Sequence, residues 1–214
     1  MSDEIDEKPR KERKENADRR RRQLLDAARR SILNHGLAKT TLATVATEAG
    51  LSQGVAVFYF KSKAGLLSAT LRDLYQSYED HWMSKLENAG PVAARRLKAL
   101  VEADFDTQAC GPDVLPLWYA FWGELRAQQE YHDIADGFEQ RRSAVLCDVW
   151  QNMWDDCDAA EAARLAHWTE RLSDGYWLQL HLDPDEQTAE TACLSAKAAL
   201  ARLAPRLHTE LGWG

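Results

Sequence analysis

A single stretch, TLATVATEAGLSQGVAVFYFKSKAGL at residues 41–66, constrains the fold of this chain more than any other. Its first apolar residues recur at three- and four-residue spacing, which predicts a helix with one buried face. They are Leu42, Val45, Ala46 and Ala49. Thr41 is a suitable N-cap for this helix and Ser52 for the next, while Gly50 can adopt the left-handed conformation that ends a helix. Two helices joined by a short glycine turn form the helix-turn-helix arrangement, whose second helix enters the major groove of DNA.

Polar side chains around the second of these helices favour DNA binding. Short hydroxyl side chains and helix N-termini suit phosphates, and Gln53 lies where a side chain reaches base edges. The basic run Arg19–Arg22 predicts contacts to the DNA backbone, which strengthen binding without selecting a sequence. The simpler interpretation is that these residues are caps and solvated surface. The residues that we expect to contact DNA are Arg21, Arg22, Thr41, Ser52, Gln53, Gly54, Val57, Phe58, Tyr59 and Lys63.

The run GLSQGVAVFYFKSKAGL, residues 50–66, resembles the helix-turn-helix of TetR-type transcriptional repressors. The recurring positions of that family are matched by Gly50, Ser52, Gly54, Tyr59, Phe60, Lys63 and Leu66. Two positions depart from it: Val57 replaces the usual tyrosine, which removes one aromatic phosphate contact, and Ala64 replaces a common acidic residue. The pieces RRRRQLLDAARRSI and YFKSKAGLLSATLRDL resemble more narrowly the BetI-type, choline-sensing repressors of betaine synthesis, a subgroup that also lacks this tyrosine.

The distribution of charge agrees with DNA binding, although the net charge of the chain is −7. Residues 1–72 carry 15 Lys and Arg against 9 Asp and Glu, whereas residues 73–214 carry 12 against 25. Positive charge is therefore concentrated with the helix-turn-helix, where it can meet phosphates. No apolar run is long enough to span a membrane and none follows the basic N-terminus, so we expect a cytoplasmic protein.

The pattern along the chain predicts an all-α protein with about nine helices and no strand. Residues 1–15 are charged and nearly devoid of core-forming side chains, and we expect them to be disordered. Residues 16–62 form the predicted DNA-binding domain, with the motif at about 41–60. Residues 63–207 form a helical domain for ligand binding and dimerisation. Its first helix, starting at Lys63, begins at the DNA-binding domain, so a ligand that displaces it would move that domain.

Aromatic residues concentrate in the second domain. Seven of the eight tryptophans lie between Trp118 and Trp213, and the eighth is Trp82. A bulky core explains any one of them. Collectively they also suit a quaternary ammonium ion, which donates no hydrogen bond and is recognised by ring faces and a nearby carboxylate. The expected ligand-binding residues are Asp104, Asp106, Trp118, Phe121, Trp122 and Trp177.

The segments ADFDTQACGPDVLPLWYAFWGE and LSDGYWLQLHLD resemble the ligand domain of the choline-sensing repressors. The resemblance implies that choline or a close relative is the inducer and that its binding releases the repressor from DNA. It also implies that the regulated genes are those of betaine synthesis or of choline uptake and catabolism. A broad aromatic pocket for lipophilic cations is the alternative. Betaine would differ from choline because its carboxylate needs a buried donor such as Arg126 or Tyr119.

Dimerisation is expected because one such DNA-binding domain reads only a few base pairs, whereas two related by a two-fold axis read a pseudo-palindromic operator. The resemblance implies that the last two long helices pair with their copies in a homodimer. The residues expected there are Trp168, Leu172, Tyr176, Ala192, Ala196, Ala199 and Leu203.

Enzymatic and metal-dependent functions have little support in the sequence. The chain has no G-x-S-x-G, P-loop or H-E-x-x-H motif, and its histidines lack evident Ser or Cys partners. The cysteines, Cys110, Cys147, Cys157 and Cys193, form no C-x-x-C pair, and the acidic run Asp155–Asp158 is expected to face water. We therefore expect no metal and no cofactor.

Overall fold

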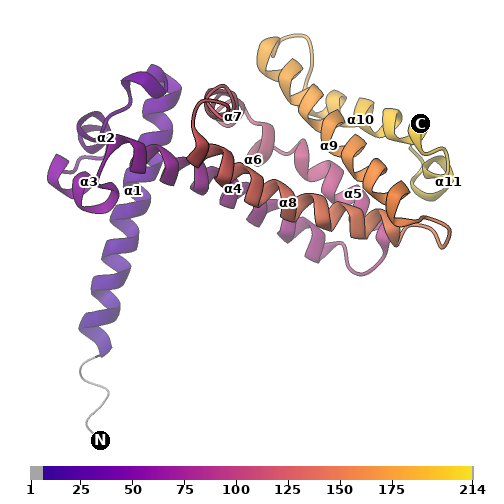
Figure 1. The fold of residues 1–214 in the computed structure, drawn as a ribbon, viewed down its shortest axis with the longest axis horizontal. Helices are drawn as coiled ribbons and strands as arrows, with labels where there is room; N and C mark the ends of the chain where they lie inside the picture. The colour runs from indigo at the N-terminus through magenta and orange to yellow at the C-terminus, as the bar shows by residue number, and fades with distance from the viewer. Residues whose placement is uncertain (1–6, 214) are drawn as a thin grey trace, which may run out of the picture. The chain divides into compact units, whose positions relative to one another are not determined.

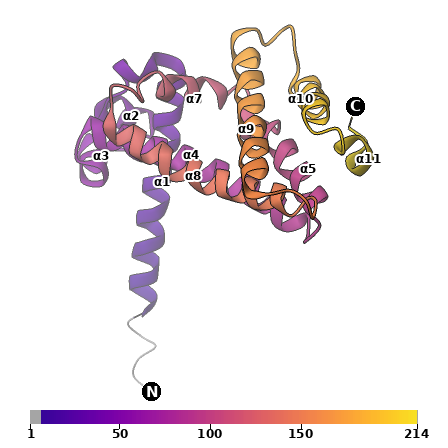
Figure 2. The same ribbon diagram turned by 45° about the vertical axis from the view of Figure 1, so that its right-hand side comes forward.

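The structure is a computed structural model that describes residues 7–213, with side chains from Glu12 onward. Within this range all regular secondary structure is helical, in eleven helices (Figures 1 and 2). They are α1 Glu7–Lys39, α2 Leu42–Glu48, α3 Gln53–Phe60, α4 Lys63–Asn88, α5 Ala93–Asp104, α6 Thr107–Cys110, α7 Leu115–Trp122, α8 Gln129–Gln151, α9 Ala159–Leu182, α10 Ala189–Leu203 and α11 Leu207–Leu211. The all-α prediction is confirmed, and the two helices beyond the expected nine are the short α6 and α11, which are too brief to show a period.

The N-terminal segment differs from its prediction where it is described. Residues 1–6 of the tail expected to be disordered lie outside the described residues, but residues 7–15 belong to α1. Glu, Lys and Arg, which dominate this segment, are strong helix formers even where they bury nothing. The helix is interrupted at Gly36, whose φ of 76° places it in the left-handed region that glycine adopts readily.

Two compact units divide the described chain, and the division falls within α4 rather than at its start. The first unit comprises residues up to Asp73 together with residues 120–131; the second comprises Leu74–Tyr119 and the chain from His132 onward. The expected boundary at residue 62 is displaced because Leu66, on the first turn of α4, is fully buried in the core that α1, α2 and α3 share.

The core of the first unit is made of small and medium apolar side chains that allow α2 to pack against both α1 and α3. Its members include Leu24, Leu25, Ala28, Val45, Ala46, Ala56 and Phe60. Gly65 marks a close approach, because a Cβ there would collide with the backbone oxygen of Phe60. Only glycine therefore allows α4 to start directly against the end of α3.

In the second unit α5 is central and packs on α6, α9, α10 and α11. The half of α4 beyond Asp73 is joined to α8 by side-chain interactions, among them the hydrogen bonds from Arg141 to Glu79 at 2.7 and 3.2 Å. A search of the described helices finds none with the length and apolarity needed to cross a membrane.

Candidate functional site

The turn between α2 and α3 is held by local hydrogen bonds of the kind that the sequence predicts. Thr41 caps α2, since its Oγ1 accepts from the backbone N–H of Thr44 at 3.1 Å, and the Thr44 hydroxyl accepts in return from the N–H of Thr41 at 2.9 Å. Gly50 has a φ of 64°, and Ser52 caps α3 through Val55. These contacts fix the angle between the two helices and leave the N-terminus of α3 open to solvent.

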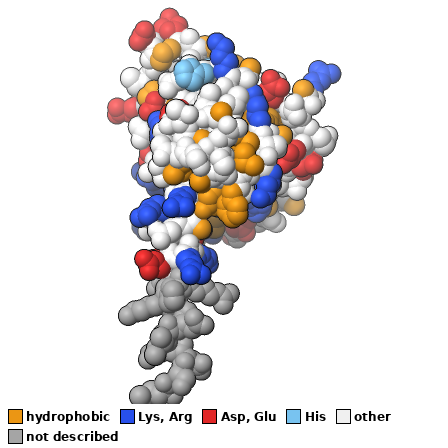
Figure 3. All heavy atoms as spheres, turned by 90° about the vertical axis from the view of Figure 1, so that its left-hand side faces the viewer, with side chains coloured by type: hydrophobic (Ala, Val, Ile, Leu, Met, Phe, Trp, Pro, Cys, Tyr) orange, Lys and Arg blue, Asp and Glu red, His pale blue; other side chains and the backbone are white. Residues whose placement is uncertain are grey.

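The outer face of α3 carries the side chains expected to meet DNA. Gln53 and Gly54 are exposed at its first turn, Tyr59 is half-buried, and Val57 and Phe58 are 40% and 68% exposed. In Figure 3, which looks at this side of the molecule, exposed apolar side chains are bordered by Lys and Arg side chains. A helix with an amide at its start and apolar side chains beyond it suits base edges and thymine methyl groups in a major groove.

The basic residues expected at phosphates have protein partners as well. Arg22 and Arg29 both pair with the buried carboxylate of Asp73, at 2.7 Å each, which ties α1 to α4 within the first unit. Arg21 lies over the Phe60 ring, 5.9 Å from its centroid, and Lys63 donates to the carbonyl of Ala38 at 2.5 Å. The Arg22 side chain is still 55% exposed, so pairing does not remove it from the surface.

In the second unit a buried carboxylate organises the interior. Asp104, at the end of α5, is 1% exposed. One oxygen accepts from the Tyr78 hydroxyl and from Arg142 Nη2, both at 2.6 Å, and the other accepts from the Ser173 hydroxyl at 2.7 Å. Its backbone carbonyl accepts from the Trp177 indole at 2.7 Å. Asp104 is thus already neutralised and hydrogen-bonded by α4, α8 and α9.

Aromatic rings from α4, α7 and α9 meet beside this carboxylate. The ring of Tyr78 lies 5.9 Å from Trp118 and 5.6 Å from Trp177, edge-on to both, and the two tryptophans stack at 6.2 Å. The indole of Trp118 donates to the carbonyl of Ala109. Burial raises the pKa of Tyr78 well above its usual value, so its hydroxyl stays a donor to Asp104.

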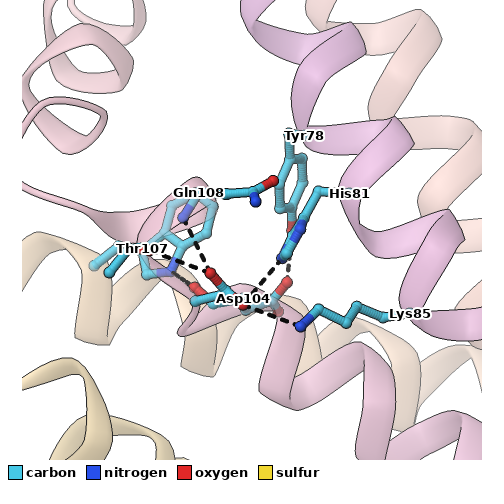
Figure 4. Close-up of polar contacts among 8 residues, drawn as sticks. Tyr78, His81, Lys85, Asp104, Thr107 and Gln108 are labelled. Carbon is cyan, nitrogen blue, oxygen red and sulfur yellow. Dashed lines mark hydrogen bonds and ion pairs between the residues drawn. The ribbon is translucent and has the colours of Figure 1, made fainter.

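Asp106 is also occupied, in a more exposed setting. It caps α6 through the N–H of Gln108 at 3.3 Å and pairs with Lys85 at 3.1 Å, with His81 Nε2 at 3.8 Å. Figure 4 shows Tyr78, His81 and Lys85, on successive turns of α4, directed toward the segment that contains Asp104. Asp104 and Asp106, the two carboxylates predicted to balance the charge of a ligand, are therefore both already paired with cationic side chains of the protein.

The structure separates the aromatic residues predicted to line one ligand site. Trp118 and Trp177 come together, as described. Phe121 instead packs edge-on against Tyr131 at 5.5 Å, and Trp122 lies half-buried in the same segment, which groups with the first unit. Tyr78 lies outside the set of ligand-binding residues that the sequence predicts.

Two carboxyl groups that also lie outside the predicted set, Glu170 and Asp174, are on α9 at a spacing that places them on one face with Ser173 and Trp177. Burial raises the pKa of Glu170 to about 7 and that of Asp174 to about 6, although Arg142 and Arg171 oppose the shift in both. The sequence holds no local signal for them, because the burial of their neighbours Thr169, Ser173 and Trp177 depends on packing against other helices.

The residues expected in a dimer surface fall into two sets. Ala192 and Ala196 are buried within the single chain, where their small side chains let α10 approach α5 and α9, so a dimer surface has to rest on other residues. Trp168, Leu172, Tyr176 and Ala199 are half-buried, and Leu203 is 44% exposed. On α9, Trp168 and Leu172 continue at helical spacing to Leu182, which is 71% exposed.

Comparison with known proteins finds matches for both halves of the chain. Residues 24–70 match the model for bacterial regulatory proteins of the tetR family, and residues 93–205 match the model for the C-terminal part of BetI-type transcriptional repressors. The HTH-type transcriptional regulator BetI of Cronobacter sakazakii is 31% identical over 81% of this chain and 85% of its own length. BetI 2 of Chromohalobacter salexigens is 34% identical over 86% of this chain and 88% of its own length.

Solved structures share the fold at lower identity. A transcriptional regulator from Pseudomonas aeruginosa PAO1 superposes with a TM-score of 0.77 and 24% identity, covering 90% of this chain and 93% of that one. A regulator from Saccharomonospora viridis, solved in complex with choline, superposes with a TM-score of 0.70 and 23% identity, covering 88% and 95%.

Proposed function

Because this chain belongs to the TetR family of bacterial transcriptional regulators and carries a BetI-type C-terminal domain, we propose that choline or a close relative releases it from its operator. Members of the family bind operator DNA, form dimers and bind small molecules, and they are regulators rather than enzymes. The genes it represses are those of betaine synthesis or of choline uptake and catabolism. The relatives named BetI and the choline-bound structural neighbour support this choice of ligand.

The observation that carries the proposal is the meeting of three aromatic rings, Tyr78, Trp118 and Trp177, beside buried charge. A quaternary ammonium ion offers no N–H, so hydrogen bonds cannot recognise it. Ring faces attract it with about 0.5–2 kcal/mol each when water is excluded. The guanidinium of Arg142 lies over the rings of Tyr78 and Trp82 at 5.2 and 5.4 Å, which indicates that this interior accommodates a cation.

Coupling to DNA follows from the course of α4. This continuous helix begins in the core of the first unit at Leu66 and contributes Tyr78 to the second. A ligand that binds one position of α4 better than another shifts the equilibrium between them, whereas equal affinity for both would shift nothing. The DNA-binding surfaces of the dimer then no longer match successive grooves.

Dimerisation is proposed at an apolar stripe of α9 and α10 whose members are half-buried or exposed in the single chain. Its members are Trp168, Leu172, Leu178, Leu182, Leu194 and Leu203. A substitution of Leu182 by Glu would place a charge on this stripe and is expected to shift the protein toward monomer in sedimentation experiments.

Binding calorimetry of the full-length protein against choline, betaine aldehyde and glycine betaine tests the choice of ligand. We expect saturable binding of choline, with a change in tryptophan fluorescence because Trp118 and Trp177 lie at the site. Comparable binding of choline and of large aromatic cations would instead favour the broad pocket for lipophilic cations. Absence of binding by all three compounds would contradict the proposal.

A further inference from the structure

We propose two further ligand contacts, an inference that rests on the proposed binding of a quaternary ammonium ligand. Glu170 supplies the negative charge that faces the cation, and Arg142 supplies the N–H that takes an oxygen of the ligand. The site would then select a small onium compound that also bears an oxygen acceptor, such as a hydroxyl, aldehyde or carboxylate. Both residues lie outside the set that the sequence predicts.

Asp104, the buried carboxylate beside the rings, already has its full set of partners. Asp104 accepts three side-chain hydrogen bonds, from Tyr78, Arg142 and Ser173, and forms an ion pair with Arg142 whose two side chains are 2% and 9% exposed. Replacing Arg142 by a ligand cation would leave a buried charge unpaired, which costs about 3–5 kcal/mol. A second carboxylate is needed to balance an incoming cation without breaking this pair.

Glu170 meets that need. It lies one turn before Ser173 and Asp174 and two turns before Trp177 on α9, so the residue that donates to Asp104 and the ring that packs on Tyr78 share its helix face. Among the described residues it forms no hydrogen bond and no ion pair, whereas Asp174 is paired with Arg171 at 3.0 Å. Glu170 is thus the acidic group of this cluster that forms no ion pair, although the charges of Arg142 and Arg171 act on it.

Arg142 offers the complementary group. Its Nη2 is held by Asp104, but its Nη1 is buried and has no hydrogen-bond partner among the described residues. Leaving a buried donor unpaired costs about 1–3 kcal/mol, and more for a charged group. An oxygen of the ligand would accept a hydrogen bond from this N–H. Because binding then removes the penalty of an unpaired buried donor, ligands that carry such an oxygen should bind more tightly.

The charges around Glu170 imply that binding is linked to a proton. The groups that interact electrostatically with it are Arg142 and Cys147 of α8, Arg171 and Asp174 of α9, and Asp104 of α5, while Glu139 of α8 interacts with Asp174. Burial holds the pKa of Glu170 near 7 in the free protein, so near neutral pH it is partly protonated. A ligand cation favours the ionised form, so binding releases a proton and affinity rises as pH increases toward and above 7.

Three ligands of similar shape separate the two contacts. Choline has both the cation and the hydroxyl, 3,3-dimethylbutan-1-ol has the hydroxyl without the charge, and ethyltrimethylammonium has the charge without the hydroxyl. Calorimetry would compare them on the full-length wild-type protein, on Glu170→Gln and on Arg142→Lys. Glu190→Gln, at an exposed position of α10, is the matched control.

We expect Glu170→Gln to weaken both cations by about tenfold or more, because a charge-assisted contact is lost, and to leave the neutral alcohol within about twofold. The increase of choline affinity between pH 5.5 and 7.5 should also be smaller in this variant than in the wild type. Arg142→Lys keeps the charge but has no second nitrogen, so it should weaken choline and leave ethyltrimethylammonium unchanged. If Arg142→Lys does not fold, a wild-type preference for choline over ethyltrimethylammonium gives the same information about the oxygen contact.

Two failures are distinguishable. Binding of none of the compounds by wild-type protein would overturn the choice of ligand and this inference together. Normal choline binding by wild-type protein, with equal affinity and equal pH dependence in Glu170→Gln, would overturn the role of Glu170 alone. Equal affinity of wild-type protein for choline and ethyltrimethylammonium would overturn the role of Arg142.

Discussion

In the first unit the side chains expected to read DNA bases lie on the outer face of one short helix, α3, whereas in the second the aromatic rings of the candidate ligand site are buried around one carboxylate. Phe58 on α3 is 68% exposed, and Asp104 at the end of α5 is 1% exposed. The outer face of α3 is rigid because its neighbours cap and pack it, so its side chains can be exchanged with little effect on folding. The interior around Asp104 contributes to folding and to ligand binding through the same contacts, so a change there alters both.

The largest expected effect is the loss of the buried carboxylate. Asp104→Asn leaves Arg142 buried without its counterion and should reduce the free energy of unfolding by about 3–5 kcal/mol. Asp106→Asn, two residues away, removes a more exposed ion pair and a weak cap and should cost about 1 kcal/mol. Urea unfolding of the two variants measures the difference. Equal losses would contradict the contrast between a buried and an exposed carboxylate.

Next in size is a glycine that supports the exposed site of the first unit. Gly65→Ala places a methyl group against the backbone oxygen of Phe60 and should destabilise the first unit by about 2 kcal/mol. At Gly54 an added Cβ meets only the Ser52 hydroxyl at 3.8 Å, so Gly54→Ala should leave the melting temperature unchanged or slightly higher. Thermal unfolding followed by circular dichroism compares them, and a larger loss at Gly54 would show that the packing of α4 on α3 is described incorrectly.

How well the sequence predicts the contacts of each region depends on how far apart the interacting residues lie along the chain. The helix-turn-helix lies within one continuous stretch, and its caps join residues three apart, such as Thr41 and Thr44, so spacing alone predicts it. The contacts of Asp104 reach Arg142, 38 residues away, and Ser173, 69 residues away. No local pattern distinguishes Arg142 or Glu170 from the other charged residues of long helices, because their surroundings come from α4, α5 and α9. The sequence likewise places Ala192 and Ala196 on one face of α10, but it does not show that this face packs in the chain's own core rather than in a dimer.

A smaller effect is expected on the exposed face of α3, where substitution should alter DNA binding without altering folding. Gln53→Ala should reduce discrimination at one base pair by about 1–3 kcal/mol. Arg21→Ala should weaken binding to all sequences alike and reduce its salt dependence, since a phosphate contact carries no sequence information. Binding to duplexes selected from a random library, at several salt concentrations, separates the two. A uniform loss with Gln53→Ala would remove it from the base-reading set.

The last effect concerns the pH dependence of stability without ligand. A carboxyl group whose pKa rises on folding, as that of Glu170 rises from 4.5 to about 7, stabilises the folded state below its unfolded pKa and loses this contribution as pH rises through 7. Glu170→Gln should therefore become more stable relative to the wild type as pH increases from 5 to 8. Denaturation at several pH values measures this difference, and a constant difference would contradict the buried setting of Glu170.

The central claim is that a cation held in the second unit controls DNA binding by the first. The direct measurement is the affinity of the full-length protein for a selected duplex, by fluorescence anisotropy, with and without choline at a concentration that calorimetry shows to be saturating. The account predicts that choline weakens DNA binding by about tenfold or more, a coupling of about 1.4 kcal/mol or more. An unchanged DNA affinity with choline fully bound would contradict it.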